Sequence, residues 1–289
     1  MKVGAHVSTA GGLHTAIDRA QEMGAETIQI FASSPRAWAF KPPSDEVVKA
    51  FREKAAASGI GPTFLHGIYL VNLGGPALLE QSVASLTAHL GVASRMGASG
   101  VIFHAGSHKG VGFDGVLPQA VAAITKVLVG SPKDAWLIIE NSTGMGNHIG
   151  ASFEEIGRII VAVGSERVKV CLDTQHSVAA GYMLLDKDGL EKAMTEFDRH
   201  IGLERLVAVH ANDSKVPPGS GVDRHENIGD GSIGEEGFLR IMSHAAFRDV
   251  PFLLEVPGIE GGGPDKANLD RLKAIRAKAM AGKGSKKGK

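Results

Sequence analysis

Residues 168–182, VKVCLDTQHSVAAGY, begin as a buried strand and end in two polar side chains that can bind metal ions. The apolar run stops at Asp173, and His176 follows three positions later. A short apolar run bounded by small residues is typical of a strand inside a parallel sheet. The segment therefore predicts a buried strand whose carboxyl end presents a carboxylate and an imidazole.

Similar apolar runs recur along the chain, and segments with helical spacing separate them. Strands are predicted at residues 2–6, 27–31, 63–66, 100–104, 135–140, 168–173, 206–210 and 251–255. Helices are predicted at residues 13–23, 45–58, 76–96, 115–129, 152–163, 188–201, 234–247 and 265–280. This alternation favours an α/β fold, a single (β/α)8 TIM barrel. The alternative is a doubly wound open sheet, but no GxGxxG motif follows the first strand.

Composition narrows the class of protein. The chain is 43% hydrophobic and 21% charged, which is typical of a globular domain, and its only cysteine is Cys171. A lone cysteine allows no internal disulfide, and no apolar segment resembles a signal peptide or a membrane span, so we expect a cytoplasmic protein. We interpret Cys171 as a residue of the barrel core and not as a metal ligand.

Charge is unevenly distributed although the formal net charge is zero. The last twelve residues contain five lysines and no acidic residue, so the rest of the chain is slightly acidic. We therefore predict one domain over residues 1–278 and a flexible Lys/Gly-rich tail over residues 279–289. Two interpretations of this tail remain open, a solubilising end and a nonspecific contact to phosphate.

Polar residues end most of the predicted strands. From the third strand to the eighth, the final residues are His66, His104, Glu140, Asp173, His210 and Glu255. In a barrel, the carboxyl ends of all strands meet on the rim where active sites of this fold are built. Crowded carboxylates would repel one another or lose hydration without a cation, so this pattern predicts a metal centre.

Two loops add further candidate ligands. His176 follows Asp173, and Asp223 and His225 are separated by one residue, a spacing that lets both side chains of an extended loop reach one ion. Five imidazoles and four carboxylates without a thiolate suit catalytic zinc or manganese, and nine ligands suggest two or three ions. The candidate ligands are His66, His104, Glu140, Asp173, His176, His210, Asp223, His225 and Glu255.

The motifs that carry these residues resemble, in order and spacing, those of the endonuclease IV family of metal-dependent apurinic/apyrimidinic (AP) endonucleases. They are GAHVSTAGG, HGIYLVNLG, FHAGSH, IIENSTGMG, CLDTQHSVAAGY, VHANDSK, VDRHENIGDGSIG and LLEVP, and the resemblance spans about residues 1–278. It implies a TIM barrel with three zinc ions, the third site being open to zinc or manganese. It also implies repair of duplex DNA by hydrolysis of the phosphodiester 5′ to an abasic site, which leaves a 3′-hydroxyl and a 5′-deoxyribose phosphate.

The resemblance also implies how the ligands are shared among the ions. His66 and His104 resemble ligands of the first ion, and Glu140 resembles a ligand that bridges the first ion to the second and orients the attacking water. Asp173, His210 and Glu255 resemble the remaining ligands of the second ion. The third ion would be held by His176, Asp223 and His225.

Loops that resemble the family's DNA-binding loops carry Arg36, Tyr69, Leu70 and Arg224. The chain departs from the family's pattern at Ser34, Gln175 and Val256, which changes no ligand. As partners we expect abasic duplex DNA, with nucleoid association when bound, no membrane and no obligatory protein, the chain acting as a monomer. Two alternative functions are a sugar isomerase or epimerase of the xylose-isomerase-like type and a lesion-binding protein without activity.

Overall fold

A computed structural model describes residues 1–284, and it confirms the closed barrel. The strands are β1 (Val3–His6), β2 (Ile28–Phe31), β3 (Thr63–His66), β4 (Gly100–Phe103), β5 (Trp136–Glu140), β6 (Val168–Asp173), β7 (Leu206–His210) and β10 (Phe252–Leu254). All neighbours pair in parallel, and β1 pairs with β10 to close the ring. The predicted α/β class and TIM-barrel architecture are therefore correct, and the open-sheet alternative is wrong.

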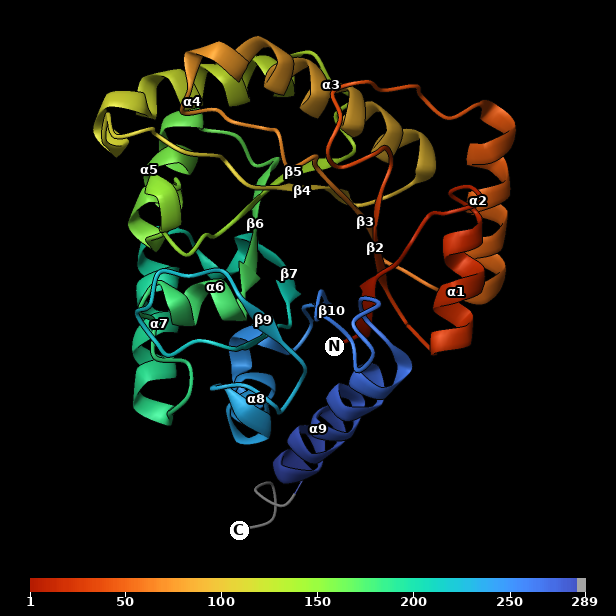
Figure 1. Ribbon diagram of the computed structural model, residues 1–289, viewed down its shortest axis with the longest axis vertical. Helices are drawn as coiled ribbons and strands as arrows, with labels where there is room; N and C mark the ends of the chain where they lie inside the picture. Colours follow the sequence, from red (N-terminus) through yellow and green to blue (C-terminus); the bar gives the residue numbers. More distant parts are fainter. Residues whose placement is uncertain (285–289) are drawn as a thin grey trace.

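Helices surround the ring of strands (Figure 1). Most of them face the barrel through an apolar stripe, as in α5, where Phe153, Ile156 and Ile160 are buried. The α-helices are α1 (Thr15–Met23), α2 (Asp45–Ser58), α3 (Leu79–Met96), α4 (Phe113–Val129), α5 (Phe153–Val163), α6 (Thr174–Ala179), α7 (Lys187–His200), α8 (Gly234–Ser243) and α9 (Lys266–Gly284). Short 3-10 turns lie at Pro76–Leu78, Met145–Asn147, Leu203–Arg205 and Ala245–Phe247.

Three elements near the site differ from the sequence prediction. Helix α6 begins directly after Asp173, whose side chain caps it by accepting a hydrogen bond from the His176 N–H at 2.8 Å. Two short strands, β8 (Asp213–Ser214) and β9 (His225–Glu226), form an antiparallel pair inside a segment that was predicted to be irregular. Six residues are too few to show helical periodicity, and two too few to show strand alternation.

The last helix continues past residue 278. The predicted domain spans residues 1–278, and α9 runs from Lys266 to Gly284. The rest of the predicted tail, residues 285–289, lies outside the described residues. Within the described part of the chain, no helix combines the length and the apolarity needed to cross a membrane.

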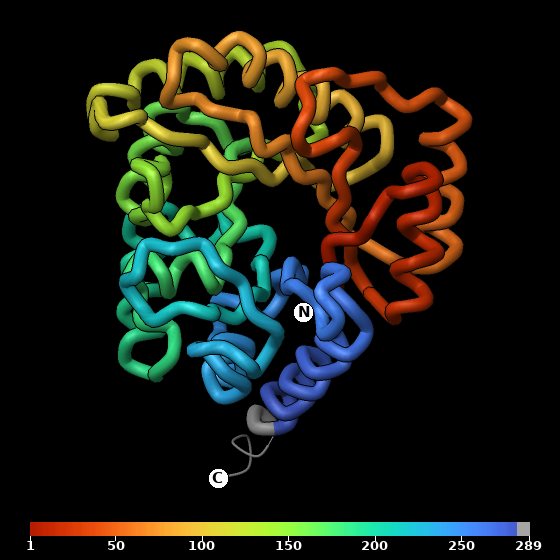
Figure 2. The backbone as a smooth tube through the Cα atoms, in the orientation of Figure 1, coloured from red at the N-terminus to blue at the C-terminus, as the bar shows by residue number. Residues whose placement is uncertain are grey.

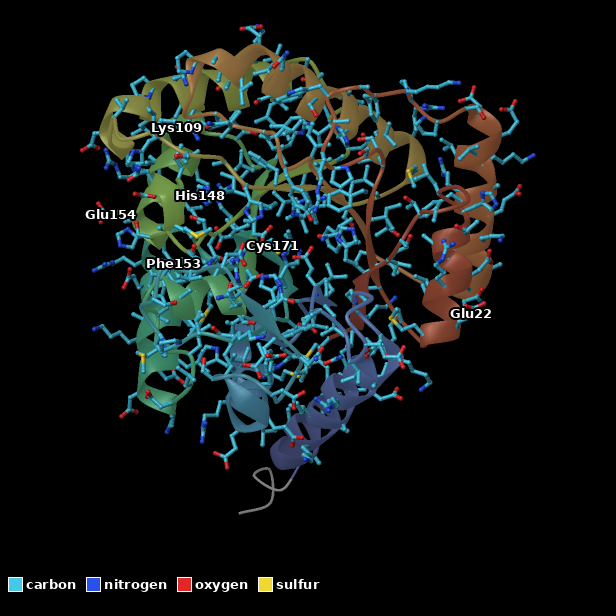
Figure 3. All side chains as sticks on the ribbon, in the orientation of Figure 1. Glu22, Lys109, His148, Phe153, Glu154 and Cys171 are labelled. Atoms are coloured by element: carbon cyan, nitrogen blue, oxygen red, sulfur yellow. The ribbon has the colours of Figure 1, made fainter. Side chains whose placement is uncertain are left out.

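Small and apolar side chains fill the inside of the barrel. Cys171 lies in this interior cluster, fully buried beside Ile138 and Ala208, and burial raises the pKa of its thiol to about 11. Figure 3 places it near the middle of the molecule, inside the ring of helices. The prediction that Cys171 is a core residue is confirmed. A packed interior leaves chemistry only to the ends of the strands.

The barrel closes where the first and last parts of the chain meet (Figure 2). Arg276 of α9 binds both carboxylate oxygens of Glu26, one of them at 2.9 Å, and donates to the Met1 carbonyl at 3.2 Å. The same carboxylate accepts the Val3 N–H at 3.0 Å. Burial alone would raise the pKa of Glu26, but Arg276 and the Val3 N–H lower it below its usual value.

We predict that Arg276→Met lowers the free energy of unfolding by about 1–2 kcal/mol at pH 7, because it removes a two-point charged contact. Since the pKa of Glu26 is lowered in the folded state, this stabilisation is present above the unfolded carboxyl pKa. It is lost as the pH falls through the folded value. Urea unfolding of the wild type and of Arg276→Met at pH 7 and pH 3 measures the difference in free energy of unfolding.

The matched control is Lys266→Met on the same helix, which breaks an exposed pair with Asp270 and costs less than about 0.5 kcal/mol. If Arg276→Met lowers the free energy of unfolding equally at both pH values, the role of Glu26 is contradicted.

Candidate metal centre

The strand ends bring the nine candidate ligands together on one rim of the barrel. Ligand atoms lie within 4.8 Å of one another in three groups. They are His66 with His104 and Glu140, then Glu140 with Asp173, His210 and Glu255, and finally Asp173 with His176 and His225. His104 and Glu255 follow the last residues of β4 and β10, so the rim is built by the strand ends and the first loop residues.

Glu140 joins the first two groups. Its Oε2 lies 3.1 Å from His66 Nε2 and 3.4 Å from His104 Nε2, and its Oε1 lies 3.0 Å from His210 Nδ1. Its side chain is fully buried at the end of β5. Because the two carboxylate oxygens face different groups of imidazoles, Glu140 is positioned to bridge two ions.

The third group contains Asp173 where the predicted grouping has Asp223. Asp223 lies at its open side, with carboxylate oxygens 3.4 Å from His176 Nε2 and 3.3 Å from His225 Nε2. Asp173 Oδ2 lies 3.8 Å from His225 Nε2 and 3.9 Å from His210 Nδ1, so it borders the second and third groups. Buried Asp173 is thus available to both groups, whereas Asp223 sits on the loop and is half exposed.

Four of the imidazoles are oriented by carbonyl oxygens. Gly67 O lies 2.7 Å from His66 Nδ1, Asn141 O lies 3.0 Å from His176 Nδ1, and Glu255 O lies 3.1 Å from His225 Nδ1. The Gln29 amide oxygen lies 2.8 Å from His210 Nε2. In a neutral imidazole, a ring N–H that donates to a carbonyl leaves the other nitrogen unprotonated and facing the cluster, as a metal ligand requires.

The charges of the site favour cations. Burial alone would lower the pKa of His176 and His210, but the surrounding carboxylates raise both well above 6.5. Burial alone would raise the pKa of Glu140, but neighbouring imidazoles hold it well below its usual range. His176 and His225 likewise hold the pKa of Asp223 at about 2 against the effect of burial. Glu140 and Asp223 therefore stay ionised and attract positive charge, whereas burial raises the pKa of Asp173.

The donor set fits divalent metal ions. His225 Nε2 is buried and has no hydrogen-bond partner in the structure, although it points at two carboxylates. Imidazole nitrogens and carboxylate oxygens in groups of three or four are typical of catalytic zinc and manganese sites. The residues present would hold such ions in all three groups.

Gln29 is a supporting residue that sequence reasoning missed. It comes from the middle of the predicted strand 27–31, where the neighbouring residues are apolar. Its amide nitrogen contacts Glu255 Oε1 at 2.5 Å and His6 Nδ1 at 2.9 Å, while its oxygen faces His210. The signal in the sequence was a single amide inside a buried strand, which is costly unless it is hydrogen-bonded.

Two asparagines fix the ligand Asp173. Asn141 accepts the Asp173 N–H at 2.7 Å, and Asn212 donates to Asp173 Oδ2 at 2.7 Å. Asn212 also accepts the Glu255 N–H at 2.8 Å, so one side chain spans β6, β7 and β10. Asn141 directly follows Glu140 and Asn212 lies two residues after His210, positions that the motifs IIENSTGMG and VHANDSK contained.

Asp213 organises the loop that carries Asp223 and His225. Its carboxylate accepts backbone N–H groups of Gly229 at 2.9 Å, Gly231 at 3.1 Å and Ile233 at 2.9 Å. The side chain of Gln175 donates to Val222 O at 3.0 Å, next to Asp223. Gln175, one of the departures from the family's pattern, thus supports the loop of the third group.

The other two departures lie at different depths. Val256 is buried directly after Glu255, and Ser34 is exposed in the loop after β2.

The predicted DNA-contact residues surround the ligand groups. Tyr69 is 58% exposed, and its ring lies 5.5 Å from that of Phe31. Its N–H donates to Pro35 O at 2.9 Å, which joins the loop of Tyr69 and Leu70 to the loop of Arg36. Arg36 and Arg224 are exposed, and Leu70 is half-buried.

Comparisons with known proteins bear on this site. Residues 17–278 match the family described as xylose isomerase-like TIM barrel. The chain is 39% identical over 276 residues to "Probable endonuclease 4" of Halothermothrix orenii, covering 94% of this chain and 99% of that protein. It is 40% identical over 287 residues to "Probable endonuclease 4" of Methanosphaerula palustris, covering 97% and 99%.

Solved structures agree with these relatives. Endonuclease IV from Thermus thermophilus superposes with a TM-score of 0.85 at 37% identity, covering 96% of this chain and all of that one. A D-tagatose 3-epimerase-like protein superposes with a TM-score of 0.74 at 16% identity, covering 99% of each chain, which shows the shared fold alone.

We predict that Gln29→Leu weakens metal retention by about 10- to 100-fold, because His210 and Glu255 lose the amide that orients them. Metal content after dialysis against graded chelator concentrations measures the effect. The matched control is Gln21→Leu, at an exposed position in the last turn of α1, the end of the helix away from the carboxyl ends of the strands. Equal metal retention in the two variants would show that Gln29 does not support the ligands.

Proposed function

The chain belongs to the endonuclease IV family of xylose isomerase-like TIM barrels, and we propose that it cleaves duplex DNA at abasic sites. The reaction is hydrolysis of the phosphodiester 5′ to the abasic nucleotide, which leaves a 3′-hydroxyl and a 5′-deoxyribose phosphate. The observation that carries the proposal is the set of three adjoining ligand groups that share Glu140 and Asp173 at the open end of the barrel.

The cofactors we propose are three zinc ions, the third site also accepting manganese. His66, His104 and Glu140 would hold the first, and Glu140, Asp173, His210 and Glu255 the second. His176, Asp223 and His225 would hold the third, with Asp173 close enough to contribute. When bound, such ions activate water, polarise the phosphoryl group and neutralise the leaving oxygen.

The residues of the chain hold the reacting groups in place. Glu140 stays ionised and buried between two groups of imidazoles, so it accepts a hydrogen bond from the attacking water and orients it. Asp173 and Asp223 occupy the side of the site toward the loop of β9. Two adjoining hollows of about 400 and 370 Å³ reach these ligands from solvent, enough for one extruded nucleotide.

The surrounding loops would bind the distorted duplex. Tyr69 and Leu70 fill the gap left in the base stack, and Arg36 supports them, because the two loops are hydrogen-bonded through Pro35. Arg224 is exposed beside Asp223 and would contact a phosphate. An abasic nucleotide has no stacked base to lose, so extruding it costs little and selects for the lesion.

A sugar isomerase or epimerase is the weaker candidate. Sugar epimerases share the fold of this chain at less than 25% sequence identity, as the D-tagatose 3-epimerase-like protein does. The third group around His176 exceeds what proton or hydride movement on a small sugar needs. Phosphodiester cleavage uses the additional positive charge, because both the attacked phosphate and the leaving oxygen are anionic.

We predict that the purified protein nicks a duplex that carries one abasic site and leaves the matching undamaged duplex intact. A chelator abolishes nicking, and added zinc restores it, because the ligands alone supply no Lewis acid. Denaturing gel electrophoresis of end-labelled strands measures the cut and its side. Turnover of ketose sugars without any nicking would instead support the isomerase.

We predict that Glu140→Gln folds but nicks at least about 100-fold more slowly, because a neutral amide cannot bridge two ions or accept a proton. Single-turnover nicking and thermal unfolding are measured together. Glu204→Gln, an exposed change in the turn before β7, serves as the control with normal activity. A near-normal rate for Glu140→Gln would remove Glu140 from the reaction.

A further inference from the structure

Two loops beside the metal centre are hydrogen-bonded to each other. The loop after β4 and the loop after β5 are linked by His108 N–H to Asn147 O at 3.0 Å and Ile149 N–H to Gly106 O at 2.8 Å. The Ser107 hydroxyl donates to Gly146 O at 2.6 Å and accepts the Lys109 N–H at 3.1 Å. These bonds fix the backbone before Lys109, and the Val111 N–H donates to His108 O at 3.0 Å just after it.

The backbone of this pair of loops is strained at two residues. Lys109 has φ 52° and Asn147 has φ 63°, and they are the only non-glycine residues with positive φ among residues 1–284. Asparagine tolerates this region, whereas lysine adopts it at a cost that glycine would avoid. A residue whose strained backbone is held by its surroundings is typical of a functional position.

Lys109 borders a hollow that contains metal-ligand candidates. This hollow, which we call the lateral hollow, is bounded by Tyr69, His104, Lys109, His148, His176 and Asp223 and has a volume of about 400 Å³. Figure 3 shows Lys109 and His148 in the same sector of the molecule, beside α4 and α5. Three candidate ligands therefore line the same hollow as Lys109 and His148.

The charge of Lys109 has no protein partner. Among residues 1–284 it forms no salt bridge, whereas Lys126 in the helix that follows pairs with Glu80 at 2.7 Å. Lys109 is the only lysine or arginine among the residues that line the lateral hollow, and burial lowers the pKa of the nearby His148. An unpaired ammonium group beside a metal centre is suited to an anion.

We propose that Lys109 is a substrate-contact residue that binds a DNA phosphate next to the scissile one, so that the cleaved strand crosses the lateral hollow. The inference rests on the proposed cleavage of abasic DNA. Tyr69, Arg36 and Arg224 lie on the other loops of the rim, and Lys109 places a phosphate contact on the side formed by β4 and β5. The hydrogen-bonded loops hold the backbone of Lys109 at the edge of the hollow, and its flexible side chain carries the ammonium group to the phosphate.

The test is the salt dependence of kcat/KM for nicking a duplex with one abasic site, from about 50 to 200 mM KCl. Each phosphate contact contributes about one unit to the slope of log(kcat/KM) against log[KCl]. We expect Lys109→Gln to make the slope shallower by about one unit and to raise KM about 10-fold, with kcat nearly unchanged. Lys109→Arg keeps the slope of the wild type.

Two further variants separate contact from loop structure. Lys109→Gly relieves the positive φ, so we expect a higher melting temperature together with the same loss of slope. Lys133→Gln is the matched control, because this exposed lysine lies in the turn before β5, at the opposite end of the barrel. We expect it to leave the slope, KM and melting temperature unchanged.

Binding measured by fluorescence anisotropy in the Glu140→Gln background, where the duplex stays intact, gives the same slopes independently of cleavage. If the wild type nicks abasic DNA and Lys109→Gln has the same slope as the wild type, the role of Lys109 is overturned and the proposed function stands. DNA binding without nicking would overturn the proposed function, and the anisotropy slopes would still decide the role of Lys109. Absence of both binding and nicking would overturn both proposals.

Discussion

Carboxylates that converge on one end of a barrel set the main constraint on this molecule. Glu140 and Asp173 are fully buried, and Glu255 and Asp223 lie beside them within reach of the same imidazoles. Buried negative charges this close are unfavourable without positive charge between them. The imidazoles supply part of it, and cations held by the three ligand groups would supply the rest. The attraction between these carboxylates and bound cations would therefore both stabilise the rim and place the metal ions that the proposed reaction needs.

The surrounding structure keeps these ligands in one arrangement. Backbone carbonyls orient His66, His176 and His225, and the amides of Gln29, Asn141 and Asn212 connect the ends of different strands. Asp213 gathers the N–H groups of a glycine-rich loop and so positions Asp223 and His225. Supporting groups of this kind restrict rotation of the ligands, which an ion with a fixed geometry requires.

Much of the fold and most of the candidate site could be predicted from the sequence. Strand β6 is readable because Val170, Cys171 and Leu172 form an apolar run, and Asp173 is conspicuous because it ends that run. Helix α6 was not predicted because Asp173 caps a single short turn of buried residues without periodicity. Gln29 and Asp213 were missed because their partners are distant in sequence, as with Gln29 and Glu255, or are backbone groups. The strained φ of Lys109 is likewise a property of packed loops that residue type does not reveal.

The proposed reaction requires cations on the rim in a defined arrangement. Anomalous X-ray diffraction at the zinc absorption edge, from crystals of the zinc-loaded protein, measures their positions directly. We predict three peaks on the rim, the first two on either side of the Glu140 carboxylate and the third beside His176, Asp223 and His225. One isolated peak, or peaks away from the ends of β3 to β7 and β10, would contradict it.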